Sequence, residues 1–380
     1  MDKISLYKPF QTSSSLEYIK EVLDSGQLAS GGKYAKVCKN WFANNYSAST
    51  IFLTSSCTDA LEMSALLARL NPGDEVILPS YTFVSTANAF VLRGCVLKFA
   101  DSISSNPNIG METILPLVTS KTKVIVVMHY AGIAVDMDPI LFFAKEKGII
   151  VIEDAAQAIG SKYKGKLLGT ISDLGCISFH VTKMISCGEG GCCIVNNKSL
   201  FDRAEIIFEK GTNRSAFQRN EVSKYEWQDV GSSFGMSELQ AALLFSQLEI
   251  FNDQLEHRQK IWKLYLSLLK ELERNSKLNL PQVPDHAEVN GTHFYILLDD
   301  QELRSRLQKY LLENNVESAF HYLALHRSPY YSNRQNQNLP NADRYESCLL
   351  RLPIHGKIEE GDVLKVCGLI YGFFKTTTDK

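Results

Sequence analysis

The sequence predicts an α/β protein in which a large domain, built on a mostly parallel and doubly wound sheet, precedes a smaller α+β domain. Three observations lead to this prediction: strand-like and helix-like segments alternate from about residue 50, two strand-like runs are almost continuously apolar, and the alternation gives way to a long amphipathic stretch. Strands covered on both faces of a parallel sheet have such continuous apolar runs. At 380 residues the chain is long enough for both domains.

The alternation begins with the strand-like segment IFLT at residues 51–54. A helix-like stretch follows over 60–70, and the turn-forming NPGD separates it from the strand-like EVILP at 75–79. Further strands are predicted at 96–100, 123–130, 148–154, in CISFH (176–180) and in CCIVN (192–196). In open sheets of this kind, ligands bind beyond the carboxyl ends of the strands.

The second part of the chain begins after a helical stretch over residues 236–271, which has apolar residues at three- and four-residue spacing. We expect this stretch to connect a large domain with an N-terminal arm, residues 1–250, to a small C-terminal domain, residues 251–380. Within the small domain we expect a strand at 293–298 and helices at 301–313 and near 359–375.

Composition argues against large charged partners. The net charge is -2, from 40 basic and 42 acidic residues, so no broad positive field is available to hold nucleic acid or an anionic membrane. No segment has the form of a signal peptide, and nowhere do 18 apolar residues run together. The sequence therefore predicts a cytoplasmic protein with a small-molecule ligand, no nucleic-acid partner and no membrane association.

The nine cysteines are scattered and form no CxxC pair. Cys192 and Cys193 are adjacent within an apolar strand, where one side chain faces each side of the sheet. We expect the cysteines to be reduced and mostly buried, without a disulfide framework or a metal site.

Two residues suggest chemistry on an amine. Asp154 stands where the buried strand of GIIVIED ends, and Lys183 follows the strand CISFH. Burial lowers the pKa of a lysine, so the neutral amine can condense with an aldehyde, and a carboxylate can hold a pyridine nitrogen protonated. The alternatives are an aspartate that caps a turn and a lysine that is simply solvated.

A phosphate site is the third part of this hypothesis. TSSCTDALEM, residues 54–63, places hydroxyl residues at the start of a helix, where free N–H groups and the helix dipole attract an anion. Glycines at 188, 190 and 191 allow the backbone to approach a ligand closely. An ordinary N-cap is the alternative.

Five strings in this order, SCTDAL, PSYTFVSTANAF, EDAAQ, SFHVTK and GEGG, resemble the DegT/DnrJ/EryC1/StrS family of pyridoxal-phosphate-dependent sugar-nucleotide aminotransferases. The resemblance covers essentially the whole chain and implies the aspartate-aminotransferase (type I) fold. PSYTFVSTANAFVLRG, EKGTNRS, GSSFGMSELQAA and FHYLALH are most similar to the branch that forms dTDP-4-amino-4,6-dideoxygalactose.

The resemblance implies roles for residues around the cofactor, pyridoxal 5'-phosphate. Lys183 binds it covalently and moves the proton, Asp154 pairs with the ring nitrogen, Phe83 stacks on the ring and Gln157 lies beside it. The phosphate contacts implied are Ser56, Cys57, Thr58 and Ser178, with Ser233 where many relatives have an asparagine that reaches across a dimer.

The resemblance also implies a substrate region. The loop 209–225 reaches the partner's active site in this family, so a homodimer with shared active sites is implied, and His321, Tyr322 and His326 lie in a segment that faces the sugar. The basic residues of the loop that suit a nucleoside diphosphate are Lys210, Arg214 and Arg219. The alternative is a solvated basic loop.

The expected reaction transfers an amino group from an amino acid to a dTDP-4-keto-6-deoxyhexose, and L-glutamate is the expected donor. The product would serve the synthesis of surface polysaccharide, including O antigen. Amination at C3 or on another nucleotide sugar remains an alternative. A sugar dehydratase of this fold has histidine in place of the lysine, so Lys183 argues against it. A regulator that binds the cofactor is disfavoured because residues 1–50 are too few and insufficiently basic for an attached DNA-binding domain.

Overall fold

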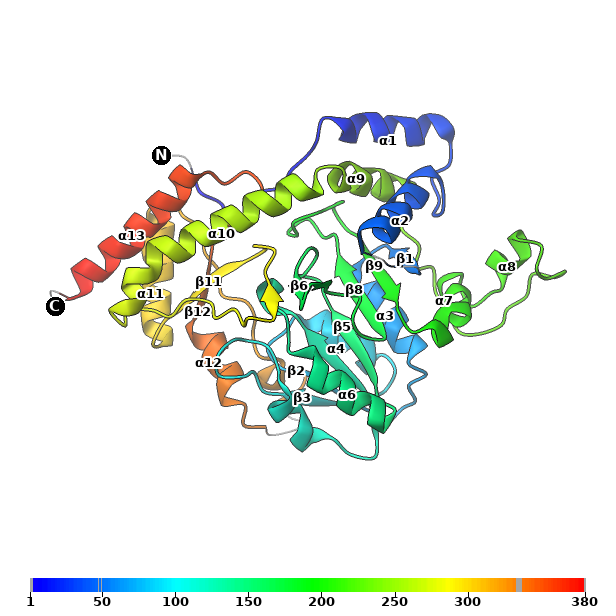
Figure 1. The fold of residues 1–380 in the computed structure, drawn as a ribbon, viewed down its shortest axis with the longest axis horizontal. Coiled ribbons are helices and arrows are strands. Elements are labelled where there is room, and N and C mark those ends of the chain that lie inside the picture. Colours follow the sequence, from blue (N-terminus) through cyan, green and yellow to red (C-terminus); the bar gives the residue numbers. More distant parts are fainter. Residues whose placement is uncertain (1–2, 47, 49, 333–336, 379–380) are drawn as a thin grey trace.

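The computed structural model describes residues 3–46, 48, 50–332 and 337–378, and its centre is a seven-stranded sheet (Figure 1). The strand order is β1-β9-β8-β5-β4-β2-β3, and all neighbours are parallel except β9, which runs antiparallel to β1 and β8. The strands are β1 (Ile51–Thr54), β2 (Glu75–Pro79), β3 (Val96–Ala100), β4 (Thr122–Met128), β5 (Ile150–Asp154), β8 (Leu174–Ser178) and β9 (Gly191–Val195). The predicted α/β class is confirmed.

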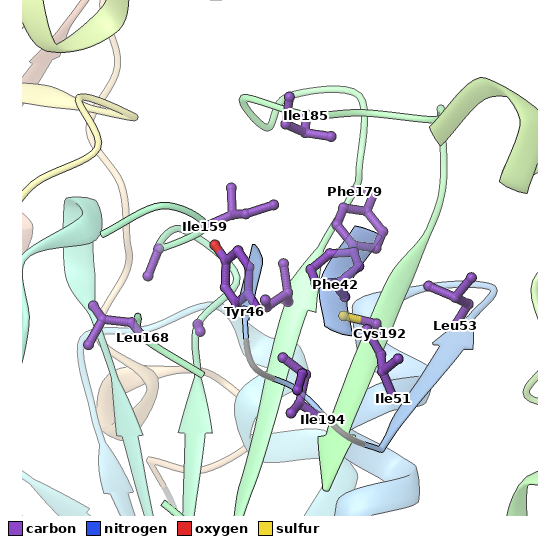
Figure 2. Close-up of a cluster of buried hydrophobic side chains, with 14 of the residues drawn as sticks. Phe42, Tyr46, Ile51, Leu53, Ile159, Leu168, Phe179, Ile185, Cys192 and Ile194 are labelled. Atoms are coloured by element: carbon purple, nitrogen blue, oxygen red, sulfur yellow. The ribbon is translucent and has the colours of Figure 1, made fainter. Parts of the chain in front are cut away.

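Helices cover both faces of this sheet, which explains the continuous apolar runs. Along β4, Ile125 and Val127 enter one core, whereas Val124 and Val126 enter the other. Figure 2 shows part of the first core, where Phe42 and Tyr46 lie near the sheet. The helices of this part are α1 (Ser14–Ser25), α2 (Lys33–Tyr46), α3 (Cys57–Leu67), α4 (Val84–Val91), α5 (Met111–Ile114), α6 (Met137–Lys147), α7 (Phe201–Phe208), α8 (Arg214–Gln218) and α9 (Glu238–Leu248).

The C-terminal part has a core of its own around a two-stranded antiparallel sheet of β11 (Phe294–Leu297) and β12 (Leu349–Leu352). The N-terminal arm reaches this core, since the Ile4 N–H donates to the carbonyl of Asn315 at 2.9 Å. The surrounding helices are α10 (Phe251–Arg274), α11 (Gln301–Glu313), α12 (Pro340–Cys348) and α13 (Glu360–Thr378), and a small sheet joins β10 (Ala287–Glu288), β6 (Lys162–Tyr163) and β7 (Lys166–Leu167).

Differences between the structure and the predicted elements include a divided helix, a shortened strand and a strand that was not predicted. The single helix expected over 236–271 is two helices, because Ile250 leaves helical geometry (φ -105°, ψ 16°) and lets α9 pack on α1 and α2 while α10 continues toward the C-terminal part. The strand expected over 123–130 ends at Met128, because the chain turns at Ala131, where φ is 56°. The strand β12 was not expected from the sequence.

The cysteines follow the prediction: all nine are free thiols and most are buried. Cys192 enters one core and Cys193 the other, as the alternation along a strand requires. Among the described helices, none is both long enough and apolar enough to cross a bilayer.

Candidate functional site

A cavity of about 510 Å³ opens beyond the carboxyl ends of the central strands and is closed on one side by residues of the C-terminal part. Its volume suits a small-molecule ligand. The predicted site residues that line it are Ser56, Cys57, Thr58, Phe83, Asp154, Gln157, Ser178, Lys183, His321 and Tyr322. Residues far apart in the sequence therefore meet here, as the rule for open α/β sheets predicts.

Asp154, the last residue of β5, is a buried carboxylate at the floor of this cavity. Its Oδ2 accepts a hydrogen bond from Thr86 Oγ1 at 2.6 Å, and its Oδ1 accepts one from the Ala156 N–H at 3.1 Å. Burial raises the pKa of Asp154 above its ordinary value, while these two hydrogen bonds oppose the rise. A positively charged N–H in the cavity would stabilise the ionised form.

Lys183 reaches the same cavity from the turn after β8, where its backbone N–H donates to the carbonyl of His180 at 2.8 Å. Burial lowers the pKa of the Lys183 amine, whereas the nearby Cys57 and Asp154 oppose the shift. Within the described part of the chain, the amine has no hydrogen bond or ion pair assigned to it. A neutral amine is a nucleophile, so this position suits condensation with an aldehyde.

The N-terminus of α3 forms one end of the cavity. Ser56 caps this helix, since its Oγ accepts from the Asp59 N–H at 3.0 Å, and the first-turn amides of Cys57 and Thr58 have no partner within the helix. Ser178 lines the cavity beside them. Free amides, a helix dipole and hydroxyl groups together suit a phosphate.

Gly191 at the start of β9 allows this helix terminus to approach the sheet. A Cβ at this position would lie 2.5 Å from the backbone nitrogen and 2.7 Å from the Cα of Cys57. We expect Gly191→Ala to push the start of α3 outward, to lower the free energy of unfolding by about 1–3 kcal/mol, and to weaken phosphate binding. Chemical denaturation and the dissociation constant of the cofactor measure the two effects.

Gly368→Ala is the matched control, because a Cβ there meets nothing within 4 Å and the residue is exposed in α13. Alanine is favoured over glycine in a helix, so the control should be neutral or slightly stabilising. An unchanged dissociation constant and stability for Gly191→Ala would show that α3 tolerates the displacement.

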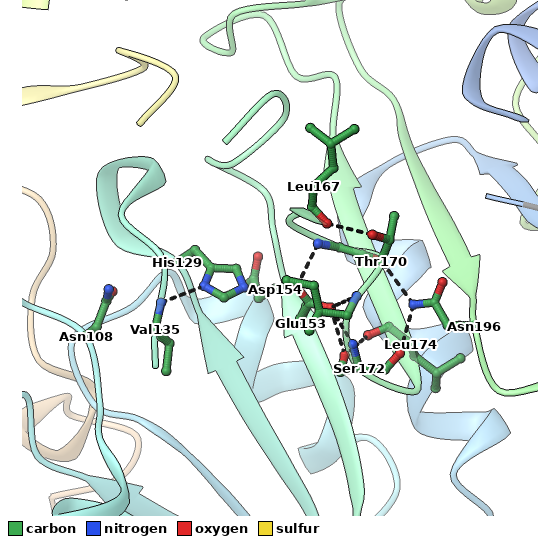
Figure 3. A network of polar contacts seen from close by, with 12 residues as sticks. Asn108, His129, Val135, Glu153, Asp154, Leu167, Thr170, Ser172, Leu174 and Asn196 are labelled. Atoms are coloured by element: carbon green, nitrogen blue, oxygen red, sulfur yellow. Dashed lines mark hydrogen bonds and ion pairs between the residues drawn. The ribbon is translucent and has the colours of Figure 1, made fainter. Parts of the chain in front are cut away.

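Glu153 precedes Asp154 in β5 and points to the other face of the sheet (Figure 3). Its carboxylate accepts from the N–H groups of Gly169, Ile171 and Ser172 at 2.7–2.8 Å and contacts His129 Nε2 at 3.1 Å. Burial opposes ionisation, but the hydrogen bond from His129 and the backbone amides prevail and hold the pKa of Glu153 below its ordinary value. Of the two acids, only Asp154 lines the cavity.

An aromatic wall faces Asp154. The Tyr322 hydroxyl accepts from Gln157 Nε2 at 2.6 Å, and Gln157 Oε1 accepts from the Ala131 N–H at 2.7 Å. Phe83 is 53% exposed, and its ring centroid lies 6.1 Å from that of Tyr322. An exposed phenylalanine at a cavity offers a face for stacking.

Five predicted residues do not line the cavity of this chain. Arg219 forms ion pairs with Glu205 and Glu221 on the surface. The buried ring of His326 contacts Ser80 Oγ at 2.7 Å. Ser233 pairs with Glu209, and the segment between them, residues 209–233, forms a projecting arm that contains α8 and extends away from the sheet (Figure 1). The other two are Lys210 and Arg214, which lie on this arm.

Sequence reasoning missed Thr86 and two lining residues, His293 and Arg351. Arg351 had a usable signal, because LLRL places a basic residue inside an otherwise apolar strand. Thr86 lies in a helical turn of ordinary composition, and His293 directly precedes an apolar strand. Neither of these positions carries a comparable signal.

Comparison with known proteins relates the whole chain to sugar enzymes. The model of the DegT/DnrJ/EryC1/StrS aminotransferase family matches residues 10–371. The chain is 31% identical over 377 residues to the GDP-perosamine synthase of Escherichia coli O157:H7, covering 98% of this chain and 99% of that protein. It is also 31% identical over 366 residues to the spore coat polysaccharide biosynthesis protein SpsC of Bacillus subtilis, covering 93% of each chain.

Solved structures agree with this relationship. The crystal structure of the aminotransferase TlmJ from Streptoalloteichus hindustanus superposes with a TM-score of 0.90 at 27% identity, over 99% of this chain and 100% of that one. The two chains therefore share the same overall fold.

Proposed function

The chain belongs to the DegT/DnrJ/EryC1/StrS aminotransferase family, and we propose that it moves an amino group from L-glutamate to the C4 ketone of a 4-keto-6-deoxyhexose carried on a nucleoside diphosphate. It is a sugar aminotransferase that depends on pyridoxal phosphate. The observation that carries the proposal is the meeting of the Lys183 amine and the Asp154 carboxylate in one cavity.

The residues present fit this cofactor. An N–H cation beside the buried carboxylate of Asp154 would favour its ionised form, the amine of Lys183 is available, and the start of α3 offers free amides to a phosphate. When bound, pyridoxal phosphate supplies an aldehyde that condenses with amines and a ring that accepts the electrons of a broken C–H bond.

Three side chains of the cavity would have separate roles toward the bound cofactor. Lys183 Nζ would hold the cofactor covalently and, once released by the donor amine, would move a proton from the donor's α-carbon to the aldehyde carbon. Asp154 would keep the ring nitrogen protonated, with Thr86 and the Ala156 amide fixing its orientation. Phe83 would cover the ring and exclude water from it.

A second copy of the chain is part of the proposal. The projecting arm carries exposed aromatic side chains, among which Trp227 is 80% exposed and Tyr225 is 53% exposed. Exposed apolar groups on an arm mark an interaction surface. In a homodimer, this arm would bring Lys210 and Arg214 to the nucleotide in the partner's cavity, and Ser233 to its phosphate end.

The nucleotide has two candidates. The motifs that resemble the dTDP-4-amino-4,6-dideoxygalactose branch favour dTDP, whereas 31% identity with the GDP-perosamine synthase of E. coli O157:H7 favours GDP. We place dTDP first because several long strings support it. The relationship to a spore coat polysaccharide protein supports a role in surface polysaccharide synthesis.

Adding L-glutamate to the protein loaded with cofactor should convert the absorbance of the lysine-bound cofactor to that of the pyridoxamine form. The converted protein, offered dTDP- and GDP-linked 4-keto-6-deoxyhexoses and 3-keto sugars, should return to the starting spectrum fastest with the dTDP-linked 4-keto sugar. NMR of the product identifies the aminated carbon and its stereochemistry. A protein that binds the cofactor but is converted by no amino acid would overturn the proposal in favour of a binding role.

A further inference from the structure

Arg351 is a cation in the cavity wall that the proposed reaction leaves without a role. It lies in the middle of β12, opposite Tyr295 of β11, and its backbone exchanges hydrogen bonds of 2.7 and 3.2 Å with Ala319 on the other side. Neighbouring segments on both sides therefore fix its position. Its side chain lines the cavity that contains Lys183.

Two imidazoles hold the guanidinium in place. Arg351 Nη1 lies 2.6 Å from His321 Nδ1, and Nη2 lies 2.7 Å from His293 Nδ1. Burial, followed by the charge of Arg351, lowers the pKa of His321 to about 4 and that of His293 well below its usual range. Both rings are therefore neutral acceptors near pH 7, so they orient the guanidinium without neutralising its charge.

The charge of Arg351 is uncompensated on this wall of the cavity. Over the described residues it takes part in no ion pair, and its buried Nε has no hydrogen-bond partner. Arg258, in the C-terminal part, is a second guanidinium that forms no ion pair within the described residues. It is buried, and its charge contributes to lowering the pKa of His293. Arg351 is partly buried, and a guanidinium that is partly removed from water without a counter-ion favours an anionic ligand.

The acids that line the cavity do not supply this anion. Asp154 is fixed by Thr86 and the Ala156 amide. Glu189 is 65% exposed and pairs with His180 at 3.5 Å. The anion must therefore come with a ligand.

We propose that Arg351 binds a carboxylate of the amino donor. This inference rests on the proposed function, because it supposes that an amino acid enters the cavity. An α-carboxylate is bonded to the carbon that bears the reacting amine, so it must lie close to Lys183. A planar guanidinium presents paired N–H groups that match a carboxylate.

The phosphates of a sugar nucleotide fit this position less well. The sugar ring separates the diphosphate from the keto carbon, which places the diphosphate farther from Lys183. Arg351, by contrast, is close enough to Lys183 for its charge to contribute to lowering the pKa of the amine. The position of Arg351 in the cavity wall near Lys183 therefore suits the smaller anion.

Arg351→Met tests the proposal on the protein loaded with cofactor. The concentration of L-glutamate that gives half-conversion of the cofactor spectrum should rise by roughly 10- to 100-fold, since a hydrogen bond to a charged group contributes about 1.5–3 kcal/mol. Calorimetric binding of glutarate, which carries carboxylates but no amine, should weaken by a similar factor. Arg351→Lys should restore part of both effects, because it keeps the charge without the planar fork.

The second half-reaction shows whether Arg351 binds the carboxylate of the amino donor or the diphosphate of the sugar nucleotide. With the pyridoxamine form prepared in advance, amination of the keto sugar by Arg351→Met should stay within about threefold of the unsubstituted protein. Arg274→Met is the matched control, since Arg274 is exposed in the last turn of α10, and it should change neither measurement. Thermal unfolding and cofactor absorbance identify any variant that has not folded. If Arg351→Met does not fold, the same measurements are made on Arg351→Lys.

Two results would overturn the assignment. One is glutarate binding and glutamate conversion by Arg351→Met that match the unsubstituted protein. The other is loss of keto-sugar amination while glutamate conversion is intact, which would assign Arg351 to the sugar nucleotide. If no amino acid converts even the unsubstituted protein, the proposed function fails, whereas glutarate binding that depends on Arg351 would still support the carboxylate site.

Discussion

Replacing Lys183 with alanine is expected to abolish both the covalent attachment of the cofactor and turnover. Proton transfer by a positioned side chain contributes roughly 10²–10⁴ in rate, and the loss of the covalent link adds to this loss. The absorbance of the lysine-bound cofactor should be absent, and both half-reactions should fall below detection. Spectra of the reconstituted protein and single-turnover assays with L-glutamate measure the two effects.

Lys198→Ala is a suitable control, because Lys198 is exposed in the turn before α7 and does not line the cavity. It should retain the spectrum and the activity. Lys183→Arg would add a second test, since the guanidinium keeps a positive charge but stays protonated and cannot condense with an aldehyde. Normal turnover by Lys183→Ala would refute the assignment of the catalytic amine.

Replacing Asp154 with asparagine is expected to lower turnover by roughly 10²–10³, the cost of removing a preorganised charge from a catalytic site. The amide can still accept from the Ala156 N–H and donate to Thr86 Oγ1, whose own hydrogen can turn to Thr82 Oγ1 at 2.9 Å. The local structure should therefore survive while the negative charge is lost. Rates of both half-reactions and the pH dependence of the cofactor absorbance measure the change.

Asp154→Asn tests the charge of the carboxylate separately from its position, because the substitution keeps the local hydrogen bonds and removes the negative charge. Thr86→Val should have a smaller effect than Asp154→Asn, since it removes one hydrogen bond to the carboxylate but leaves the charge. If Asp154→Asn turned over at the normal rate with an unchanged spectrum, the carboxylate would have no part in holding the ring nitrogen protonated.

Local sequence patterns predicted the seven strands of the central sheet and proposed Asp154 and Lys183 as the catalytic pair. The first three strands have the predicted bounds, because short apolar runs bounded by turn residues leave few other conformations. The position of Asp154 at the end of a buried strand followed from the same pattern, and strand alternation separates it from Glu153. Strings of residues in order, rather than periodicity, indicated the family.

Only the tertiary structure decided which distant residues surround that pair. The meeting of Arg351 with His293 and His321 depends on how β12 pairs with β11 and with the segment at Ala319, and no local pattern encodes that pairing. The break at Ile250 likewise follows from the different surfaces on which α9 and α10 pack, without a glycine or proline to mark it. Local chemistry is set by neighbours in the chain, whereas the charge balance of a cavity is set by residues that only folding brings together.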